Sequence, residues 1–183
     1  PRGKSLGGSS ATNAMAYVRG NSKDYDNWQE MGNKGWNYDS LLPYFKKSEN
    51  NHSFNNEFHG KNGELNVSLR KEYNKSTYKF IEACKENGLN FNEDYNGENQ
   101  EGSSFLQYTI DKNVRQSTYE AFLKPISDRT NLTIKTKTFV KKIIIENGKA
   151  IGVEIYIGKN SSEKIFCNKE VILCAGAIQS PQL

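Results

Sequence analysis

The stretch Leu6–Met15, LGGSSATNAM, combines residue types that suit the binding of a phosphate-bearing ligand. Its two adjacent glycines lack Cβ atoms, so the backbone there can pass close to a bound group. Ser9 and Ser10 stand where a helix is predicted to begin, over residues 9–18, and either serine can cap it. The unpaired N–H groups and the dipole of such a helix start favour an anion, and a diphosphate suits this chemistry.

The residues that follow the serines suit a flat ligand. Asn13 and the small side chains of Ala14 and Ala16 would let a ring lie against the first turns of the predicted helix. A Gly-Gly-Ser-Ser run also fits a plain capped loop without any ligand, and such loops are the commoner occurrence. The residues alone therefore leave both interpretations open.

Histidines and neighbouring carboxylates are the other candidates for acid–base chemistry. His52 and His59 lie in the polar loop 52–63, where we expect a solvent-facing His52 and a turn-forming His59. Helix-cap or surface roles are expected for four carboxylates: Asp24, Asp26, Glu93 and Asp94. The sequence therefore assigns no catalytic residue.

The three cysteines, Cys84, Cys167 and Cys174, are odd in number and widely separated, with no CxxC spacing. This pattern predicts free thiols of a reducing compartment rather than a disulfide or zinc framework. It favours a cytoplasmic protein and leaves open the membrane association of a longer chain.

The chain has 183 residues and a formal net charge of +4. This length suits one good-sized domain or two small lobes. No run of five like charges occurs, so nucleic acid is not an expected partner. No apolar stretch approaches the roughly 20 residues of a membrane-spanning helix, so no such segment is predicted.

Helices are predicted over three ranges in the first half of the chain: 21–33, 38–50 and 77–88. Asp39 is expected to cap the second helix, with Pro43 in its first turn. Asn74 or Ser76 is expected to cap the third, which Gly88 ends. Five aromatic residues are predicted to form a core that joins the first two helices to the rest of the protein: Trp28, Trp36, Tyr38, Tyr44 and Phe45.

The remaining elements are mainly strands. Residues 64–69 and 104–111 have strand character, and residues 117–129 predict a helix that breaks near Pro125. After them, β-branched runs separated by Asn-Gly and Gly-Lys turns predict an antiparallel meander: 132–136, 138–148, 150–158 and 163–170. The apolar run 171–175, VILCA, is typical of a buried parallel strand. The fold class is therefore mixed α and β.

Longer strings resemble a known family. The chain carries PRGK, LGGSS, an N-x-M pair, Y-x-RGN, D-Y-D-x-W and G-x-x-G-W in that order over residues 1–36. This order is similar to the first signature of the glucose–methanol–choline (GMC) oxidoreductases, especially choline dehydrogenases and related alcohol dehydrogenases. FHGKNGEL at 58–65 and CAGAIQSPQL at 174–183 resemble further family segments. The resemblance therefore runs from end to end.

This resemblance implies an FAD-dependent enzyme that oxidises an alcohol, with hydride transfer from the alcohol carbon to the flavin. It implies a set of cofactor-contacting residues: Leu6, Gly7, Gly8, Ser9, Asn13, Ala14, Met15, Ala16, Val140, Ala175 and Gly176. Some relatives attach FAD through a histidine near the N-x-M asparagine. Residues 11–14 read Ala-Thr-Asn-Ala, so we expect non-covalent FAD.

The resemblance also implies a domain arrangement. Residues 1–40 and 131–183 belong to a partial, Rossmann-like FAD-binding lobe, and 41–130 to a substrate lobe with an antiparallel sheet. We expect an interior piece of a longer protein, with the dinucleotide glycine motif and the catalytic histidine outside it. A small alcohol is the expected partner, and the electron acceptor stays open. A non-catalytic binding module derived from the same family is the alternative.

Overall fold

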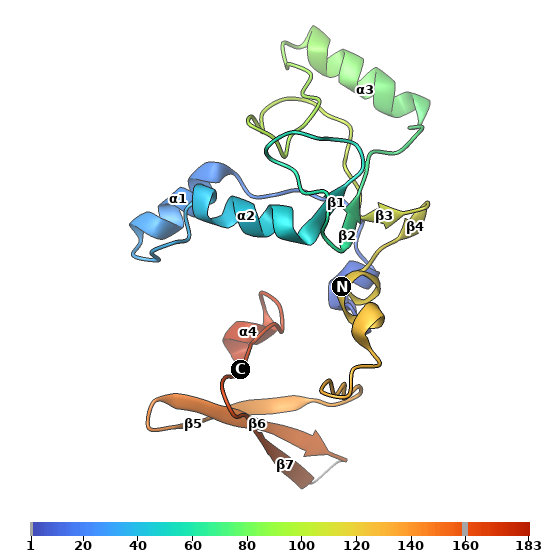
Figure 1. Cartoon of the computed structure of the whole chain (residues 1–183). Coiled ribbons are helices and arrows are strands. Elements are labelled where there is room, and N and C mark those ends of the chain that lie inside the picture. The colour runs from blue at the N-terminus through green and yellow to red at the C-terminus, as the bar shows by residue number, and fades with distance from the viewer. Residues whose placement is uncertain (1, 159–160) are drawn as a thin grey trace. The chain divides into compact units, whose positions relative to one another are not determined.

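The structure, a computed structural model, describes residues 2–158 and 161–183. The chain forms two compact units, Pro1–Arg129 and Thr130–Leu183, which are described separately (Figure 1). Both helices and strands occur, so the predicted mixed fold class is confirmed. Among the described residues, no helix combines the length and the apolar character that crossing a membrane requires.

The chain opens with a 3₁₀ turn, η1 (Gly8–Ala11), and the helix predicted over residues 9–18 is wrong. The Asn13 side chain accepts a hydrogen bond from the Met15 amide at 3.0 Å, and Met15 has a positive φ of 63°. This local side-chain bond offers the backbone an alternative to the helix. The chain then runs extended, and the Tyr17 amide donates to the Gln107 carbonyl at 2.9 Å.

Helices α1 (Ser22–Glu30) and α2 (Tyr38–Ser48) lie side by side in Figure 1. The cap expected at Asp39 is wrong, because Asn37 is the N-cap and Asp39 lies in the first turn. Pro43 sits one turn further into the helix than predicted. The aromatic core is confirmed only in part, since Trp28 and Trp36 pack with ring centroids 6.0 Å apart but both stay partly exposed.

Two short parallel strands, β1 (Glu49–Asn51) and β2 (Leu65–Val67), follow and pair in register. β2 confirms the centre of the strand predicted over 64–69. Of the residues predicted to form a strand over 104–111, only Ile110–Asp111 do so, as β3. This strand pairs antiparallel with β4 (Val114–Arg115). Helix α3 (Lys75–Glu86) confirms the prediction, with the Asn74 side chain accepting from the Ser76 amide at 3.0 Å.

The helix predicted over 117–129 appears as a single π-helical stretch, η2 (Tyr119–Leu123), followed by a 3₁₀ turn, η3 (Lys124–Ile126). The break predicted near Pro125 lies in η3. Three of the four largest fully buried side chains of the described chain are polar: Gln107, Glu49 and Asn51, with Val67 as the fourth. Unit 1 therefore has a core that depends on hydrogen bonds as well as on apolar packing.

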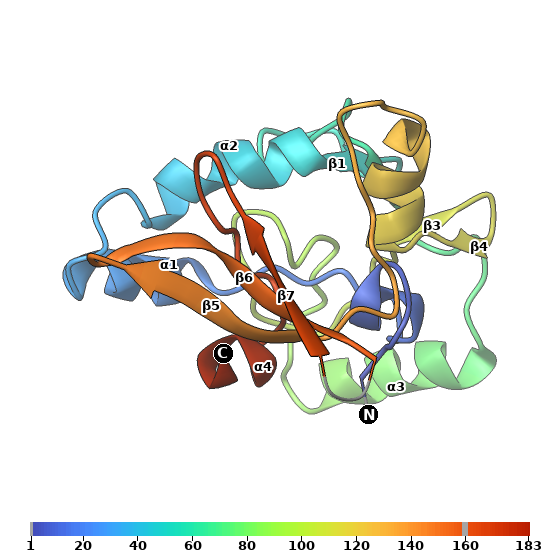
Figure 2. The same ribbon diagram turned by 90° about the horizontal axis from the view of Figure 1, so that it is seen from below.

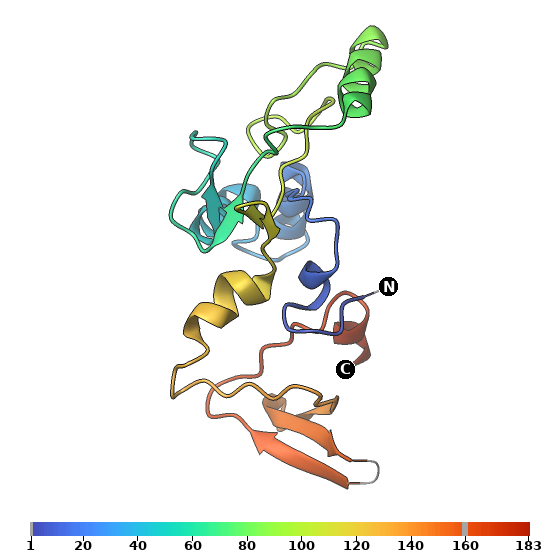
Figure 3. The same cartoon turned by 90° about the vertical axis from the view of Figure 1, so that its right-hand side faces the viewer.

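The second unit contains the predicted antiparallel meander, β5 (Val140–Glu146), β6 (Lys149–Ile157) and β7 (Ser161–Phe166), in that order across the sheet (Figures 2 and 3). Asn147 and Gly148 connect β5 to β6 with φ values of 50° and 75°. Two positive φ values at Asn-Gly match the type I′ turn, so this prediction is confirmed. The turn expected at Gly158–Lys159 reaches residues 159–160, which lie outside the described residues.

Two strand predictions in this unit are wrong. Neither 132–136 nor 171–175 is a strand, and Ile172 is 77% exposed. A parallel strand needs a neighbour to satisfy its backbone, and the described part of this unit pairs no segment with residues 171–175. The chain ends in a single helical turn, α4 (Gln179–Gln182).

Candidate functional site

The glycine loop, defined as Leu6–Ala11, has a backbone that only glycine adopts easily. Gly7 and Gly8 have φ values of 85° and 53°. A Cβ atom on Gly8 would meet no atom within 4 Å, whereas one on Gly7 would lie 3.1 Å from the Tyr119 amide nitrogen. Gly7 therefore faces packed protein and Gly8 faces open space, which is the arrangement that lets a ligand approach the backbone.

The segment 115–119 clamps the glycine loop from the packed side. The Ser10 hydroxyl accepts from the Thr118 amide at 2.9 Å and donates to the Gly7 carbonyl. Arg115 donates through Nη1 to the Ser10 carbonyl at 3.2 Å and to the Asn13 Oδ1 atom at 2.9 Å. Neither Thr118 nor Arg115 could be identified from the sequence, because more than 100 residues separate them from the loop.

The predicted ring-contacting residues lie directly after this loop. Asn13, Ala14 and Ala16 are exposed, and Met15 is half-buried. The Met15 carbonyl accepts from the Thr109 amide at 2.9 Å, so this stretch is held as extended chain. The helix-dipole part of the sequence argument fails here, because η1 has only four residues. What remains of that argument is the open backbone at Gly8.

In the second unit, the predicted residues Val140 and Ala175 line one cavity of about 560 Å³. Its walls include the apolar side chains of Ile143, Val153 and Leu173. Gly176 follows Ala175 with a φ of 90°. The structure thus brings two of the three predicted residues of this unit to a single, mainly apolar cavity.

A buried polar cluster, which we define as Arg19, Glu49, Asn51, His59 and Asp94, lies in the first unit. Glu49 is fully buried and accepts hydrogen bonds on both carboxylate oxygens. Oε2 accepts from Arg19 Nη2 at 2.6 Å and from the Gly60 amide at 3.1 Å. Oε1 accepts from His59 at 2.9 Å and from Asn51 Nδ2 at 2.8 Å. The ion pair and hydrogen bonds compensate the burial of this charge.

His59 bridges two carboxylates, and this contradicts its expected role as no more than a turn residue. Its backbone does close a turn, but its side chain is fully buried. Nδ1 lies 2.9 Å from Glu49 Oε1, and Nε2 lies 2.9 Å from Asp94 Oδ2. Ionised carboxylates only accept hydrogen bonds, so a ring protonated on both nitrogens, an imidazolium, satisfies both of these contacts. The ring also stacks on Phe54 at 5.4 Å.

The titration behaviour of the cluster follows from these contacts. Burial lowers the pKa of His59, but its hydrogen bonds to Asp94 and Glu49 raise it more, and the net pKa lies above the usual range. Burial raises the pKa of Glu49, yet hydrogen bonds from His59, Asn51 and Arg19 hold it below its usual range. The pKa of Asp94 is lowered for the same reasons, against its burial, by His59 and Asn56.

Most other acid–base candidates behave as predicted. His52 is exposed, and its Nε2 atom lies 2.7 Å from Asn66 Oδ1. Asp26 accepts from the Tyr38 amide at 3.1 Å at the start of α2. Asp94 is the exception, since the surface or cap role expected for it gives way to a place in the buried polar cluster. Among the described residues, no group of three or more His, Cys, Asp or Glu side chains is arranged to hold a metal ion.

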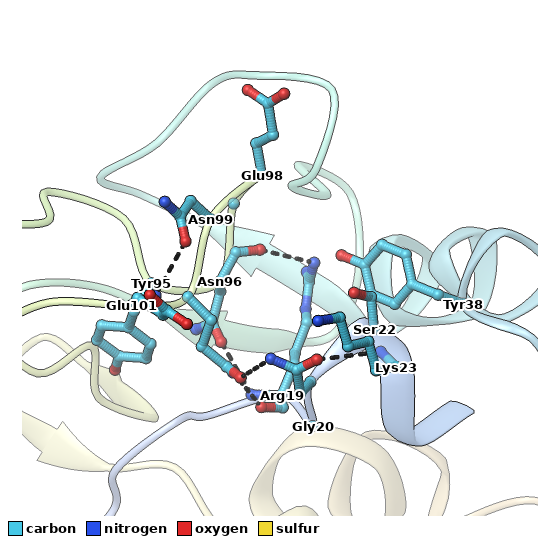
Figure 4. Close-up of a pocket in the computed structure, with 13 residues that line it drawn as sticks. Arg19, Gly20, Ser22, Lys23, Tyr38, Tyr95, Asn96, Glu98, Asn99 and Glu101 are labelled. Atoms are coloured by element: carbon cyan, nitrogen blue, oxygen red, sulfur yellow. Dashed lines mark hydrogen bonds between the residues drawn. The ribbon is translucent and has the colours of Figure 1, made fainter. Parts of the chain in front are cut away.

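A small polar cavity of about 210 Å³ lies beside the cluster (Figure 4). The Arg19 amide donates to Asn96 Oδ1 at 2.8 Å, and Gln100 Nε2 donates to the Arg19 carbonyl at 2.8 Å. Figure 4 shows Asn96 next to Arg19. Two residues of the cavity wall, Asn96 and Gln100, therefore fix the position of Arg19.

The sequence did contain a signal for His59. It belongs to the FHGKNGEL string, in which Cβ atoms on Gly60 and Gly63 would collide with the backbone at the end of α2 and the start of β1. These glycines allow the loop to pack against Glu49. The string thus reflects a close approach that brings a histidine to a buried carboxylate, although the carboxylate partner is distant in sequence.

Comparison with known proteins places this fold in a family. A family model described as GMC oxidoreductase matches residues 1–183. The oxygen-dependent choline dehydrogenase of Sinorhizobium medicae (strain WSM419) is 43% identical over 183 residues, which are 100% of this chain and 33% of that protein.

Two solved structures have the same fold. The pyridoxine 4-oxidase from Mesorbium loti matches with a TM-score of 0.89 at 34% identity, over 98% of this chain and 36% of that one. An FAD-dependent oxidoreductase from Chaetomium thermophilum matches with a TM-score of 0.92 at 29% identity, over 100% of this chain and 34% of that one. The fold is therefore one that oxidoreductases use.

The family follows from the match over the whole chain: the protein belongs to the GMC oxidoreductases. The predicted family resemblance is thereby confirmed. The chain spans about a third of the length of the curated relatives that it matches, 33% for the Sinorhizobium protein.

Proposed function

We propose that this chain forms part of an FAD-dependent oxidoreductase that oxidises the hydroxyl-bearing carbon of a small alcohol, in the manner of a choline dehydrogenase. The observation that carries the proposal is the glycine loop, whose Gly8 backbone is both left-handed and open to a ligand. Support comes from the names of the similar proteins, which include a choline dehydrogenase and an FAD-dependent oxidoreductase.

The residues present fit a flavin dinucleotide. Leu6, Gly7, Gly8 and Ser9 would face its diphosphate and flavin, and Asn13–Ala16 would face the isoalloxazine ring. In the second unit, the backbone of Val140 would face the adenine, with Ala175 and Gly176 nearby. When bound, FAD supplies the hydride acceptor, and the protein supplies binding, orientation and exclusion of water.

FAD is proposed to be held without a covalent bond. No histidine stands at residues 11–14, and the exposed Asn13 amide is not a nucleophile of the kind that a histidyl linkage needs. Hydrogen bonds from the glycine-loop backbone and burial of the ring would then carry the affinity.

The proton acceptor for the alcohol is proposed to lie outside these 183 residues. His59 cannot serve, because its side chain is fully buried and both ring nitrogens already contact carboxylates. His52 lies on the surface in contact with Asn66. This chain is therefore proposed to contribute binding and orientation, and no catalytic residue is assigned to it.

The proposed partner is a small-molecule alcohol, with no nucleic-acid partner. A reducing compartment, such as the cytoplasm, is proposed because Cys84, Cys167 and Cys174 are all free thiols and Cys174 is exposed. An exposed free thiol is easily oxidised outside such a compartment.

Anaerobic reduction of the bound flavin tests the proposal. The full-length protein that carries this chain is purified and mixed without oxygen with choline, an aliphatic alcohol or an aromatic alcohol. Loss of the yellow flavin absorbance on addition of choline is the expected result. A yellow protein that no alcohol bleaches would instead indicate a non-catalytic flavin-binding module, and a colourless protein that cannot be reconstituted with FAD would contradict the proposal altogether.

A further inference from the structure

The segment Met15–Arg19 joins the predicted flavin-facing residues to the buried polar cluster. Tyr17 is its centre: the Tyr17 amide donates to the Gln107 carbonyl at 2.9 Å, and the Tyr17 carbonyl accepts from Asn96 Nδ2 at 3.0 Å. Arg19 is its end, where the amide donates to Asn96 Oδ1 and the guanidinium pairs with Glu49. Tyr17 and Arg19 are thus both tied to buried groups.

The groups that hold this segment are themselves held by the two carboxylates of the cluster. Gln107 is fully buried, and its Nε2 atom donates to Asp94 Oδ1 at 2.9 Å. The other oxygen of Asp94 faces His59 Nε2, and His59 Nδ1 faces Glu49. The His59 imidazolium is therefore the link between the carboxylate that orients Gln107 and the carboxylate that pairs with Arg19.

We propose that His59 is a positioning residue: its imidazolium, held between Glu49 and Asp94, fixes the Met15–Arg19 segment and so orients the flavin-facing residues Asn13–Ala16. This inference rests on the proposed function, since it concerns the flavin of that site. His59 acts only through other residues and touches neither the flavin-facing residues nor the glycine loop.

The charge balance of the cluster explains why the imidazolium is needed. Arg19 and His59 carry two positive charges, and Glu49 and Asp94 carry two negative ones, all in a largely buried space. A neutral side chain at residue 59 leaves one excess negative charge and two carboxylates without their shared cation. An uncompensated buried charge moves toward water, and here the movement would displace the partners of Tyr17 and Arg19.

The test compares His59→Gln with His52→Gln in the full-length, flavin-loaded protein. His52 is a matched control because it lies on the same loop, is exposed, and has its Nε2 atom within hydrogen-bond distance of a neutral asparagine, Asn66. Two quantities are measured: hydrogen exchange of the Tyr17 and Arg19 amides, and the rate at which FAD dissociates. For His59→Gln we expect both rates to rise at least about tenfold. For His52→Gln we expect no change.

A second pair of variants keeps the test decisive if His59→Gln folds poorly. Asp94→Asn leaves an amide oxygen facing His59 and is expected to shift both rates in the same direction by a smaller factor. The double variant His59→Gln with Asp94→Asn restores the charge balance, so we expect exchange and FAD release to return toward wild-type values.

Two results would overturn the inference. One is a His59→Gln protein, or an Asp94→Asn protein, that melts at a lower temperature while amide exchange at Tyr17 and Arg19 and FAD release stay unchanged. The other is a double variant no better than the single ones. If the wild-type protein holds no flavin, the proposed function fails, but the hydrogen-exchange comparison on the same proteins still decides whether His59 fixes the segment.

Discussion

The glycine loop and the buried polar cluster lie in the same unit but differ in how they are exposed and packed. The loop holds left-handed backbone at Gly7 and Gly8 and leaves open space beside Gly8. The cluster closes on itself, with Glu49 and His59 fully buried and every charge paired. One region leaves open space beside its backbone, whereas the other pairs its charged groups internally.

This difference shows how the rest of the protein can hold a left-handed loop in place. The left-handed turn is held by Arg115 and Thr118 on one side. The Met15–Arg19 segment that follows it is tied to the cluster. Backbone strain persists only where the surroundings fix it. We therefore regard the cluster as the support and the glycine loop as the contact surface, and each variant below separates these two roles.

The largest expected effect is that of Gly8→Val in the full-length protein. Valine resists a φ of 53°, and its side chain would occupy the open space beside the loop. We expect complete loss of bound flavin with helix and strand content retained. The ratio of visible to ultraviolet absorbance and far-ultraviolet circular dichroism measure the two quantities.

Gly88→Val is the matched control for this variant. Gly88 has a φ of 83° at the end of α3, and a Cβ atom there would also meet nothing within 4 Å. The backbone strain is comparable, so Gly88→Val is expected to lower stability while flavin is retained. Equal flavin loss in both variants would mean that strain, and not a contact at Gly8, explains the result.

The second largest effect is that of His59→Gln on stability. Removing one partner of a buried ion pair costs about 3–5 kcal/mol, because it leaves the other charges uncompensated. We expect guanidinium unfolding of the His59→Gln protein to show a loss of this order near pH 6, and the exposed His52→Gln variant to show almost none. A smaller loss in the free energy of unfolding for His59→Gln than for His52→Gln would show that the cluster does not support the fold.

The pH dependence of this loss has a defined sign. The pKa of folded His59 is above its usual 6.5. The stabilising effect of His59 is therefore complete below pH 6.5 and disappears as the pH rises through the pKa of the folded state. The carboxylates have lowered pKa values, so their contribution is complete above their usual 4.5 and 3.8 and is lost toward acid. The difference between wild type and His59→Gln is therefore expected to be largest between about pH 5 and 6.5.

A smaller effect is expected for Arg115→Ala, which removes one hydrogen bond to the glycine loop, at Ser10, and one to Asn13 just after it. One such bond contributes about 1 kcal/mol, so flavin affinity is expected to fall about fivefold to thirtyfold. Equilibrium titration of the flavin-free protein with FAD measures this change. The exposed Arg70→Ala is the control, and an unchanged affinity for Arg115→Ala would show that the clamp does not prepare the loop.

The smallest effect belongs to a residue outside both regions. Asn74→Ala removes the side-chain cap of α3 and is expected to cost about 1 kcal/mol of stability with no change in flavin affinity. Asn37→Ala is its counterpart, because Asn37 makes no capping hydrogen bond to α2 and is expected to cost less. Loss of flavin from Asn74→Ala would show that a loss of stability alone reduces flavin binding, so the two effects could not be told apart.

Local signals in the sequence predicted several elements correctly. Asn74 followed by a periodic apolar face gave α3, and Asn147–Gly148 gave the hairpin turn between β5 and β6. These elements depend on residues close together in sequence. The helix over 9–18 failed because the Asn13 side chain accepts from the Met15 amide and the Thr109 amide donates to the Met15 carbonyl. A helix would have used both of these Met15 groups.

The candidate site was predictable only on its open side. Gly7 and Gly8 stand out in the sequence as an adjacent glycine pair. In the structure they have the left-handed backbone that glycine allows. The partners of His59 could not be predicted, because Glu49 and Asp94 lie 10 and 35 residues away and look like surface carboxylates. Only the fold shows that the two carboxylates converge on one ring.

Acid precipitation of the purified full-length protein tests the central claim most directly, because it reports both whether the protein holds a flavin and whether the attachment is covalent. The account predicts that free FAD appears in the supernatant and that the protein pellet is colourless. Flavin fluorescence that stays with the pellet would contradict non-covalent binding. The absence of flavin from both fractions, even after reconstitution with FAD, would contradict the assignment of the loop itself.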